Sequence, residues 1–235
     1  HGLDDIGRQD HLSLGVTDAQ VSYLQHLLNH ALRSTPGRVP LSEDGVFGQK
    51  TDTAVRLFQS SYRGSEGRLK LDGIVGPKTW RALGLVNEVS HNLPRVGQNT
   101  MMSCWVVSAG LATRRMASIV PATAKFLADG GLVPSRDNLQ AFANELRMQL
   151  LPGVPLIVDQ LFGPLQRGPI LMVGRKPAGL HAVVISAYYG GIERTTKMIQ
   201  IHNPSPLGRG SIEVTHYPEM VLENMIFDPV AMIVS

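Results

Sequence analysis

The sequence carries DGVFGQKT at residues 44–51 and DGIVGPKT at residues 72–79, so the pattern D-G-[VI]-[FV]-G-x-K-T occurs twice. In each copy Asp-Gly is typical of a turn, and the second glycine allows a tight entry into a helix. Pro77 suits the first turn of such a helix, where its missing N–H leaves no bond unmade. The repeat therefore predicts two turns that each lead into a helix.

Apolar residues at helical spacing accompany both copies. The first copy is followed by an apolar face within residues 54–58, and the second runs into residues 80–83. An earlier helix is indicated by Thr17-Asp18 and by the apolar positions within residues 21–32. Together these segments predict a compact bundle of three helices over residues 12–86.

The order and spacing of these motifs resemble the three-helix type of bacterial peptidoglycan-binding domain. This resemblance implies a non-catalytic anchor to the cell wall. We interpret Asp44 and Asp72 as turn formers rather than ligand contacts, because Asp-Gly turns explain them fully. The segment 33–40 is longer than the family pattern, and it bears on the shape of any binding groove.

Composition excludes several classes of protein. The 235 residues are 43% hydrophobic with a formal net charge of +3 and no basic run, so we expect a packed core and no nucleic-acid partner. The longest apolar stretches are far below the roughly 18 residues that cross a bilayer, so we expect no membrane span. Cys104 is the single cysteine, which excludes an intramolecular disulfide and cysteine-rich zinc sites.

The second half of the chain changes character after a polar segment, residues 87–95, that we interpret as a linker. Helices are predicted at residues 103–117, 122–129 and 138–150, and the strand-like runs follow them. Those runs are residues 169–173, 181–189, 198–201, 211–215 and 230–234, with a hairpin turn expected at 188–191. Helices before strands predict an α+β fold with an antiparallel sheet. We therefore expect a helical domain at 1–90 and a second domain at 91–235.

A lone cysteine is usually a small buried hydrophobe, but the surroundings of Cys104 favour a nucleophile. Ser103 precedes it as an N-cap type of residue, which places the thiol in a first helical turn, where amide dipoles favour a thiolate. Gln98 lies six residues upstream, and His181 opens a predicted strand in GLHAVV at residues 179–184. These three residue types predict nucleophilic catalysis.

The pattern Gln98-x5-Cys104-Trp105, followed by the His181 strand and by IHNP at residues 201–204, resembles the papain-like cysteine peptidases. The interval from Cys104 to His181 is closest to the compact bacterial branch, and the resemblance covers residues 93–235. It implies that Cys104 attacks as a thiolate paired with an imidazolium at His181 and that Asn203 orients this imidazole. Gln98 and the Cys104 amide would stabilise the oxyanion.

Other polar residues receive weaker roles. Glu213 and Asp228 are alternative orienters of His181, and His202 should face away from Asn203 because side chains alternate along a strand. His26 and His30 are spaced to share a helix face, but no third metal ligand is evident, so we interpret them as surface residues. Trp105 is expected to pack beneath the site. The pairs Arg114-Arg115 and Arg175-Lys176 are interpreted as solvated charges and not as phosphate sites.

The two resemblances predict a papain-like cysteine hydrolase tethered to the bacterial cell wall, needing no metal or cofactor. It would cleave amide bonds in peptidoglycan peptides, as an endopeptidase or an amidase, after secretion or delivery to the periplasm or wall. Such an activity is compatible with a lytic effector and a cognate immunity protein. Two alternatives remain at this point: an effector protease that cuts target proteins and uses the anchor for localisation, and a non-catalytic wall-binding protein.

Overall fold

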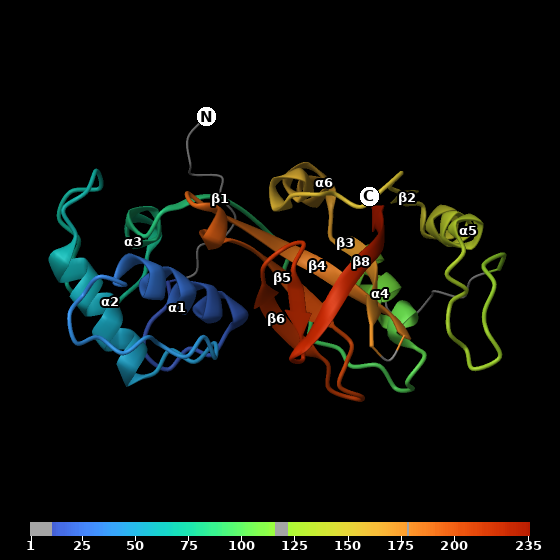
Figure 1. Ribbon diagram of the computed structural model, residues 1–235, viewed down its shortest axis with the longest axis horizontal. Coiled ribbons are helices and arrows are strands. Elements are labelled where there is room, and N and C mark those ends of the chain that lie inside the picture. The colour runs from blue at the N-terminus through green and yellow to red at the C-terminus, as the bar shows by residue number, and fades with distance from the viewer. Residues whose placement is uncertain (1–10, 116–121, 178) are drawn as a thin grey trace. The chain divides into compact units, whose positions relative to one another are not determined.

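The computed structural model describes residues 11–115, 122–177 and 179–235. Its elements, shown in Figure 1, are in order α1 (Ala19–Ala31), α2 (Gln49–Ser61), α3 (Pro77–Ala82), β1 (Leu85–Ser90), α4 (Cys104–Thr113), α5 (Arg136–Leu146), β2 (Gln149–Leu150), η2 (Val158–Leu161), α6 (Phe162–Arg167), β3 (Ile170–Lys176), β4 (Gly179–Gly191), η3 (Arg194–Thr196), β5 (Lys197–Asn203), β6 (Ser211–Thr215), β7 (Met220–Leu222) and β8 (Met225–Val234). In this described part of the chain, no helix combines the length and the apolar character that crossing a membrane requires.

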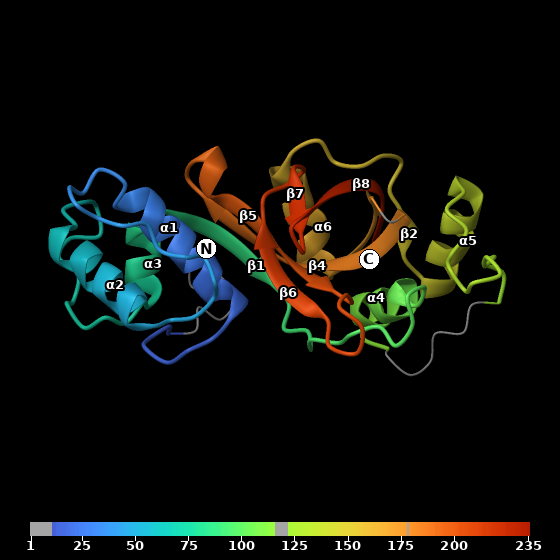
Figure 2. The same cartoon turned by 60° about the horizontal axis from the view of Figure 1, so that its bottom comes forward.

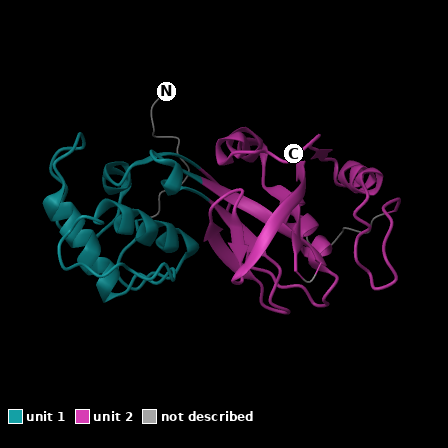
Figure 3. Cartoon of the chain, viewed as in Figure 1, with its two compact units in different colours: residues 1–88, 189–198 teal, residues 89–188, 199–235 magenta. Residues whose placement is uncertain are grey.

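The chain divides into two compact units (Figure 3). Unit 1 consists of residues 1–88 and 189–198, and unit 2 consists of residues 89–188 and 199–235. The first boundary lies close to the one expected from the sequence. The segment 189–198, which the sequence analysis assigned to the second domain, packs with unit 1 instead.

The repeated Asp-Gly turns in unit 1 are built alike, and each is held by a glutamine from the preceding helix. Gln25 on α1 donates through Nε2 to Asp44 Oδ1 at 2.9 Å and accepts the N–H of the next residue at 3.0 Å. Gln59 on α2 makes the equivalent bonds to Asp72 Oδ1, at 3.1 Å, and to the following N–H, at 3.0 Å. The two carboxylates are thus occupied inside their turns, as the interpretation of Asp44 and Asp72 as turn formers requires.

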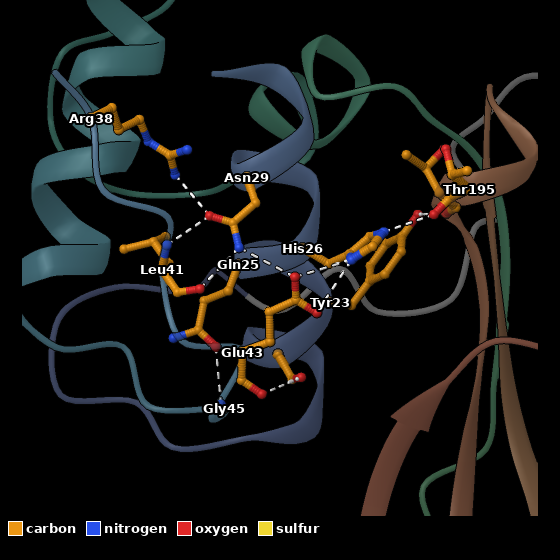
Figure 4. Close-up of polar contacts among 11 residues, drawn as sticks. Tyr23, Gln25, His26, Asn29, Arg38, Leu41, Glu43, Gly45 and Thr195 are labelled. Carbon is orange, nitrogen blue, oxygen red and sulfur yellow. Dashed lines mark hydrogen bonds and ion pairs between the residues drawn. The ribbon is translucent and has the colours of Figure 1, made fainter. Parts of the chain in front are cut away.

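The segment 189–198 is attached to α1 by one ring contact and two hydrogen bonds. The ring of Tyr189 stacks on Tyr23, with centroids 4.6 Å apart and an interplanar angle of 14°. Tyr23 Oη donates to the carbonyl of Thr196 at 2.9 Å, and His26 Nε2 lies 2.7 Å from the carbonyl of Thr195, as Figure 4 shows for His26. The two contacts of Tyr23 are buried, so Tyr189 and Thr196 add to the core of unit 1, whereas the His26 contact is exposed.

Unit 2 is built on an antiparallel sheet, which confirms the α+β expectation. The strand order of the whole eight-stranded sheet is β2-β8-β3-β4-β5-β6, with β1 paired to β4 and β7 paired to β8. Alternate residues of β3 and β4 face two separate cores. Val173, Ala182 and Val184 contribute to the core that contains α4 and α5, and Figure 2 shows α4 beside these strands. Met172 and Val183 contribute to the other core.

Several predicted elements of the second half differ from the structure. Residues 122–129 do not form a helix, because the side chain of Asn138 on α5 takes the backbone hydrogen bonds of Lys125. Asn138 Oδ1 accepts the N–H of Lys125 at 2.6 Å, and Asn138 Nδ2 donates to the carbonyl of Lys125 at 2.9 Å. The helix expected at 138–150 is α5, which ends at Leu146, so that β2 can pair with β8. The helix expected at 103–117 is described as Cys104–Thr113, and residues 116 and 117 lie outside the described residues.

Two further segments differ in detail from the expectation. The hairpin turn with its entry expected at 188–191 begins after Gly191, because β4 continues to that residue and the chain then turns through η3. Within the expected linker 87–95, residues up to Ser90 belong to β1, which pairs with β4. Burial along this strand does not follow polarity, because Glu88 is buried while Val86 is 50% exposed.

Candidate active site

Cys104 is the first residue of α4 and lies against β4. Its side chain is buried in the same core as Ala182, the residue after His181, and the backbone amide of Ala182 acts to lower the pKa of the thiol. Ser103 occupies the N-cap position, but its hydroxyl donates to the carbonyl of Thr100 at 3.0 Å and makes no bond to the helix. The amides at the start of α4 are therefore not capped by a side chain, and those of Cys104 and Trp105 act on the sulfur.

His181 and Asn203 are brought together by β4 and β5. His181 Nε2 lies 2.7 Å from Asn203 Oδ1, and both side chains are buried. Asn203 Nδ2 donates to Glu213 Oε1 at 3.2 Å, while the N–H of Ser205 donates to Oδ1 at 3.0 Å. Because these bonds make Oδ1 an acceptor, His181 must donate through Nε2. The neutral imidazole then keeps its lone pair on Nδ1, which is the form needed by a general base.

A chain of polar contacts extends behind Asn203. The carboxylate of Glu213 accepts the N–H of Glu223 at 3.0 Å, and Glu223 Oε2 forms a 2.8 Å ion pair with the buried Lys176. Glu223 has a φ of 50° and Asn224 a φ of 60°, which places both in the left-handed region within the two-residue turn between β7 and β8. A non-glycine residue there is strained, so the contacts of Glu223 hold an unfavourable backbone in place.

Lys176 and Glu223 were missed by the sequence analysis. Lys176 was interpreted as a solvated charge, and this is wrong because it is buried at the end of β3. Glu213 was named as an alternative orienter of His181, and it instead contacts Asn203. Asp228, the other alternative, is exposed and lies opposite Arg175 in the sheet. The turn residues Glu223-Asn224 lack the Asn-Gly or Asp-Gly pair that indicates a tight hairpin, so the sequence carries no clear signal for this cluster.

Gln98 is fixed by its backbone to the loop that follows Asn203. Its N–H donates to the carbonyl of Pro204 at 2.9 Å, and its carbonyl accepts the N–H of Gly208 at 2.8 Å. A Cβ on the preceding Gly97 would lie 2.2 Å from the nitrogen of Arg209, so only glycine allows this close approach. The Gln98 side chain donates from Nε2 to the carbonyl of Met101 at 3.0 Å, and its buried Oε1 has no hydrogen-bond partner in the described residues.

His202 and Trp105 take structural positions. His202 alternates with Asn203 and faces the carbonyl of Pro94, 3.2 Å from its Nδ1. Burial lowers the pKa of His202 to about 4, so this ring is neutral near pH 7. Trp105 donates to the carbonyl of Gly130 at 2.9 Å and packs against the ring of Phe126. This placement agrees with a packing role for Trp105.

Burial is the largest influence on the pKa values of Cys104 and His181. It raises the pKa of the Cys104 thiol, although backbone amides and the charge of Lys176 act in the opposite direction. Burial also lowers the pKa of His181, against the hydrogen bond that its ring donates to Asn203. Both directions favour the neutral thiol and neutral imidazole, which differs from the resting ion pair expected from the sequence. The reason is that desolvation penalises two charges in a buried site.

The alkylation rate of Cys104 should therefore rise steeply with pH. A raised thiol pKa leaves little thiolate at pH 7, and the thiolate is the reacting form. We expect iodoacetamide to alkylate Cys104 more slowly at pH 7 than it alkylates the same chain unfolded in urea, with the rate still rising above about pH 8.5, the ordinary thiol pKa. Mass spectrometry at a series of pH values measures this rate. A rate already at its plateau at pH 6 would instead support the ion pair.

Unit 1 contains a separate groove of about 750 Å³ between α2 and the segment that precedes the first Asp-Gly turn. Val39 and Leu41 from that segment and Leu57 from α2 are among its lining residues, and Val39 is 81% exposed. Asn29 on α1 holds the segment by accepting the N–H of Leu41 at 2.7 Å and a bond from Arg38 at 2.9 Å (Figure 4). The longer segment 33–40 thus shapes one wall of this groove.

The two histidines of α1 contact glutamates. His26 Nδ1 lies 3.1 Å from Glu43, and His30 Nε2 lies 3.1 Å from Glu193. Burial disfavours the charge on His26, but the hydrogen bonds to Glu43 and Thr195 and the charge of Glu43 outweigh it and raise the pKa of His26. Both rings are partly covered rather than fully exposed, so they differ from simple surface residues.

The comparisons with known proteins bear on unit 1. Residues 17–83 match the family model described as "Putative peptidoglycan binding domain". None of the curated proteins compared with this chain matches it. The matched range holds α1, α2, α3 and both Asp-Gly turns. The helical part of the chain, residues 17–83, is thus similar to a peptidoglycan-binding domain, which indicates association with the cell wall, while the likeness of residues 93–235 to papain-like peptidases stays a prediction.

Proposed function

We propose that this chain is a wall-bound cysteine hydrolase that cleaves amide bonds in peptidoglycan peptides. The observation that carries the catalytic part is the 2.7 Å contact between His181 and Asn203, next to Ala182, which shares a buried core with Cys104. The match of residues 17–83 to a peptidoglycan-binding family supports the wall as the location of the substrate. A domain that binds the wall raises the local concentration of peptidoglycan amide bonds around Cys104 without changing the catalytic residues.

In the proposed reaction the Cys104 thiol gives its proton to Nδ1 of His181 as the sulfur attacks the amide carbonyl. The tetrahedral intermediate collapses when the C–N bond breaks, and the amine leaves with the proton from His181. A water molecule then attacks the thioester, gives a proton to His181 and releases the acid. The proton returns to the sulfur, which restores the starting thiol and imidazole.

Asn203 and Gln98 have supporting roles in this reaction. Asn203 accepts a hydrogen bond from the Nε2–H group of His181 and stabilises the imidazolium that forms there, as third residues of catalytic triads do. Gln98 uses one N–H toward Met101, which leaves the second N–H of its amide for the oxyanion. One such donor contributes about 3 kcal/mol to the stabilisation of a transition state.

We place wall binding in the groove of unit 1 because it presents exposed apolar side chains beside polar groups. The double variant Val39→Ser/Leu57→Ser should bind sacculi about ten-fold more weakly. Burying these two apolar side chains against the wall contributes roughly 1–2 kcal/mol to the binding free energy, and the variant loses this contribution. Sedimentation of the full-length protein with purified sacculi measures this affinity. Leu71→Ser, which changes an exposed leucine outside the groove lining, serves as the matched control and should bind normally. Equal binding by all variants would contradict this placement.

The substrate class is tested by incubating the full-length protein separately with purified sacculi and with a denatured protein. Mass spectrometry of the soluble products identifies the bond cleaved in each case. We expect new amines from the wall peptides, or from the glycan–peptide amide, and no defined cut in the protein. Cleavage of the protein at a defined site without release of wall fragments would show that the substrate is a polypeptide and not the wall. The proposed cysteine mechanism would be unaffected by that result.

A further inference from the structure

A second polar cavity lies in unit 2, lined by residues from five segments of the chain. It is an open hollow of about 440 Å³ between the C-terminal ends of α4, α5 and α6, His91 and Ser235. Four arginines line it, and all four are exposed to solvent, namely Arg114, Arg115, Arg147 and Arg167. None of the described residues that line this cavity is an aspartate or a glutamate. The volume falls within the range typical of small-ligand sites, which is about 300–1,000 Å³.

The guanidinium groups here have few partners. Arg114 contacts His91 at 3.4 Å, and Arg167 donates to the carbonyl of Ser235 at 2.8 Å. Among the described residues, Arg115 and Arg147 have neither an ion pair nor a side-chain hydrogen bond. By contrast, Arg56 and Arg81 in unit 1 each pair with a carboxylate. Residues 116–121, which follow Arg115, read MASIVP and contain no acidic residue.

Two of the arginines are held in an unfavourable backbone conformation. Arg114 ends α4 and Arg147 ends α5, each with a φ of 57° in the left-handed region. Glycine is the usual residue at such a helix end, because it adopts this conformation without steric cost. A positive side chain also interacts favourably with the C-terminal dipole of a helix. That effect accounts for a cation near each helix end, but not for the gathering of four exposed guanidinium groups around one hollow that has no carboxylate side chain among its described lining residues.

We propose that this cavity binds a ligand that carries a diphosphate group. Arginine presents a planar set of donors that matches the oxygens of phosphate, and such charge-assisted bonds are stronger than neutral ones. A single carboxylate would neutralise one of the four guanidinium groups, whereas a diphosphate carries several negative charges and many acceptor oxygens. The charge of a diphosphate therefore matches the arginine set more closely. This site is independent of Cys104 and of the proposed hydrolysis.

Isothermal titration of the full-length protein with inorganic pyrophosphate in about 0.15 M salt tests the proposal. We expect saturable binding with one site, weakened at least about ten-fold by Arg147→Gly, because one charge-assisted hydrogen-bond pair is lost. The same substitution should raise the melting temperature of the free protein, since glycine relieves the left-handed backbone. Arg115→Gln, at a position with an ordinary backbone, should weaken pyrophosphate binding to a similar extent.

The control is Arg175→Gln, which removes the same charge from an exposed position outside the cavity lining and should change the affinity less than two-fold. A nucleoside diphosphate and a short alkyl diphosphate, titrated beside pyrophosphate, distinguish which organic group accompanies the diphosphate. Absence of saturable pyrophosphate binding would overturn the proposal. Equal loss of binding in Arg175→Gln and Arg147→Gly would also overturn it, by showing that only net charge matters.

Discussion

The Cys104→Ala chain is expected to lose amide hydrolysis by about six orders of magnitude, the scale seen when the nucleophile of a comparable triad is removed. The reason is that no other residue of the candidate site can form the covalent intermediate. Binding to sacculi should be unchanged, because the groove of unit 1 contains no part of this site. The amount of released wall fragments measures the rate of hydrolysis, and sedimentation measures binding to sacculi.

The stability of this variant should change little. Cys104 is 8% exposed and packs in the core with Ala182 and Val184, so replacing its sulfur by hydrogen costs about 1 kcal/mol of unfolding free energy. Ser103→Ala, a change at the neighbouring position, is the control and should keep most of the activity. A Cys104→Ala chain that retains a tenth of the normal rate would show that Cys104 is not the nucleophile.

The His181→Ala chain should be nearly as inactive as the Cys104→Ala chain, and the double variant should be no worse than either single one. Nucleophile and base act as a unit, so their losses do not add. The kcat of each variant on a soluble wall peptide provides the measurement. Additive losses, with the double variant far below both single ones, would indicate that the two residues act in separate steps.

Asn203→Ala should be milder, lowering kcat about ten- to hundred-fold, because one hydrogen bond to a developing imidazolium is worth roughly 1.5–3 kcal/mol. The KM should change little, since Asn203 is buried behind His181. Asp228→Asn is the control, as this exposed residue lies outside the contacts of Asn203. A larger loss in Asp228→Asn than in Asn203→Ala would overturn the assignment of the third residue.

The parts of the structure that the sequence predicts best are local. The repeated Asp-Gly turns predict two helix starts, at α2 and α3, because the chemistry of the turn lies within a few residues of each helix. The α+β class follows from the order of helical and strand-like runs. Residues 122–129 were predicted as a helix because their neighbours in sequence permit one, but Asn138, more than ten residues away in the chain, takes the backbone bonds of Lys125.

Long-range contacts explain what the sequence did not predict. Nothing in the sequence near Tyr189 indicates that it stacks on Tyr23, so the return of segment 189–198 to unit 1 was unforeseen. A chain cut at residue 90 would lose this ring, which is why the experiments above use the full-length protein. The contact of His181 with Asn203 was expected from the resemblance to papain-like peptidases. The Lys176–Glu223 ion pair was not expected, because it depends on the turn between β7 and β8, which the fold brings near Lys176.

The most direct test of the proposed hydrolysis compares the full-length protein with its Cys104→Ser variant on the same purified sacculi. New amino groups are counted over time and the soluble fragments are identified by mass, while sedimentation confirms that both proteins bind equally. We predict steady release of wall peptides by the unchanged protein and none above background by Cys104→Ser. Equal release by the two proteins, or release by neither, would contradict the conclusion that Cys104 hydrolyses amide bonds of the cell wall.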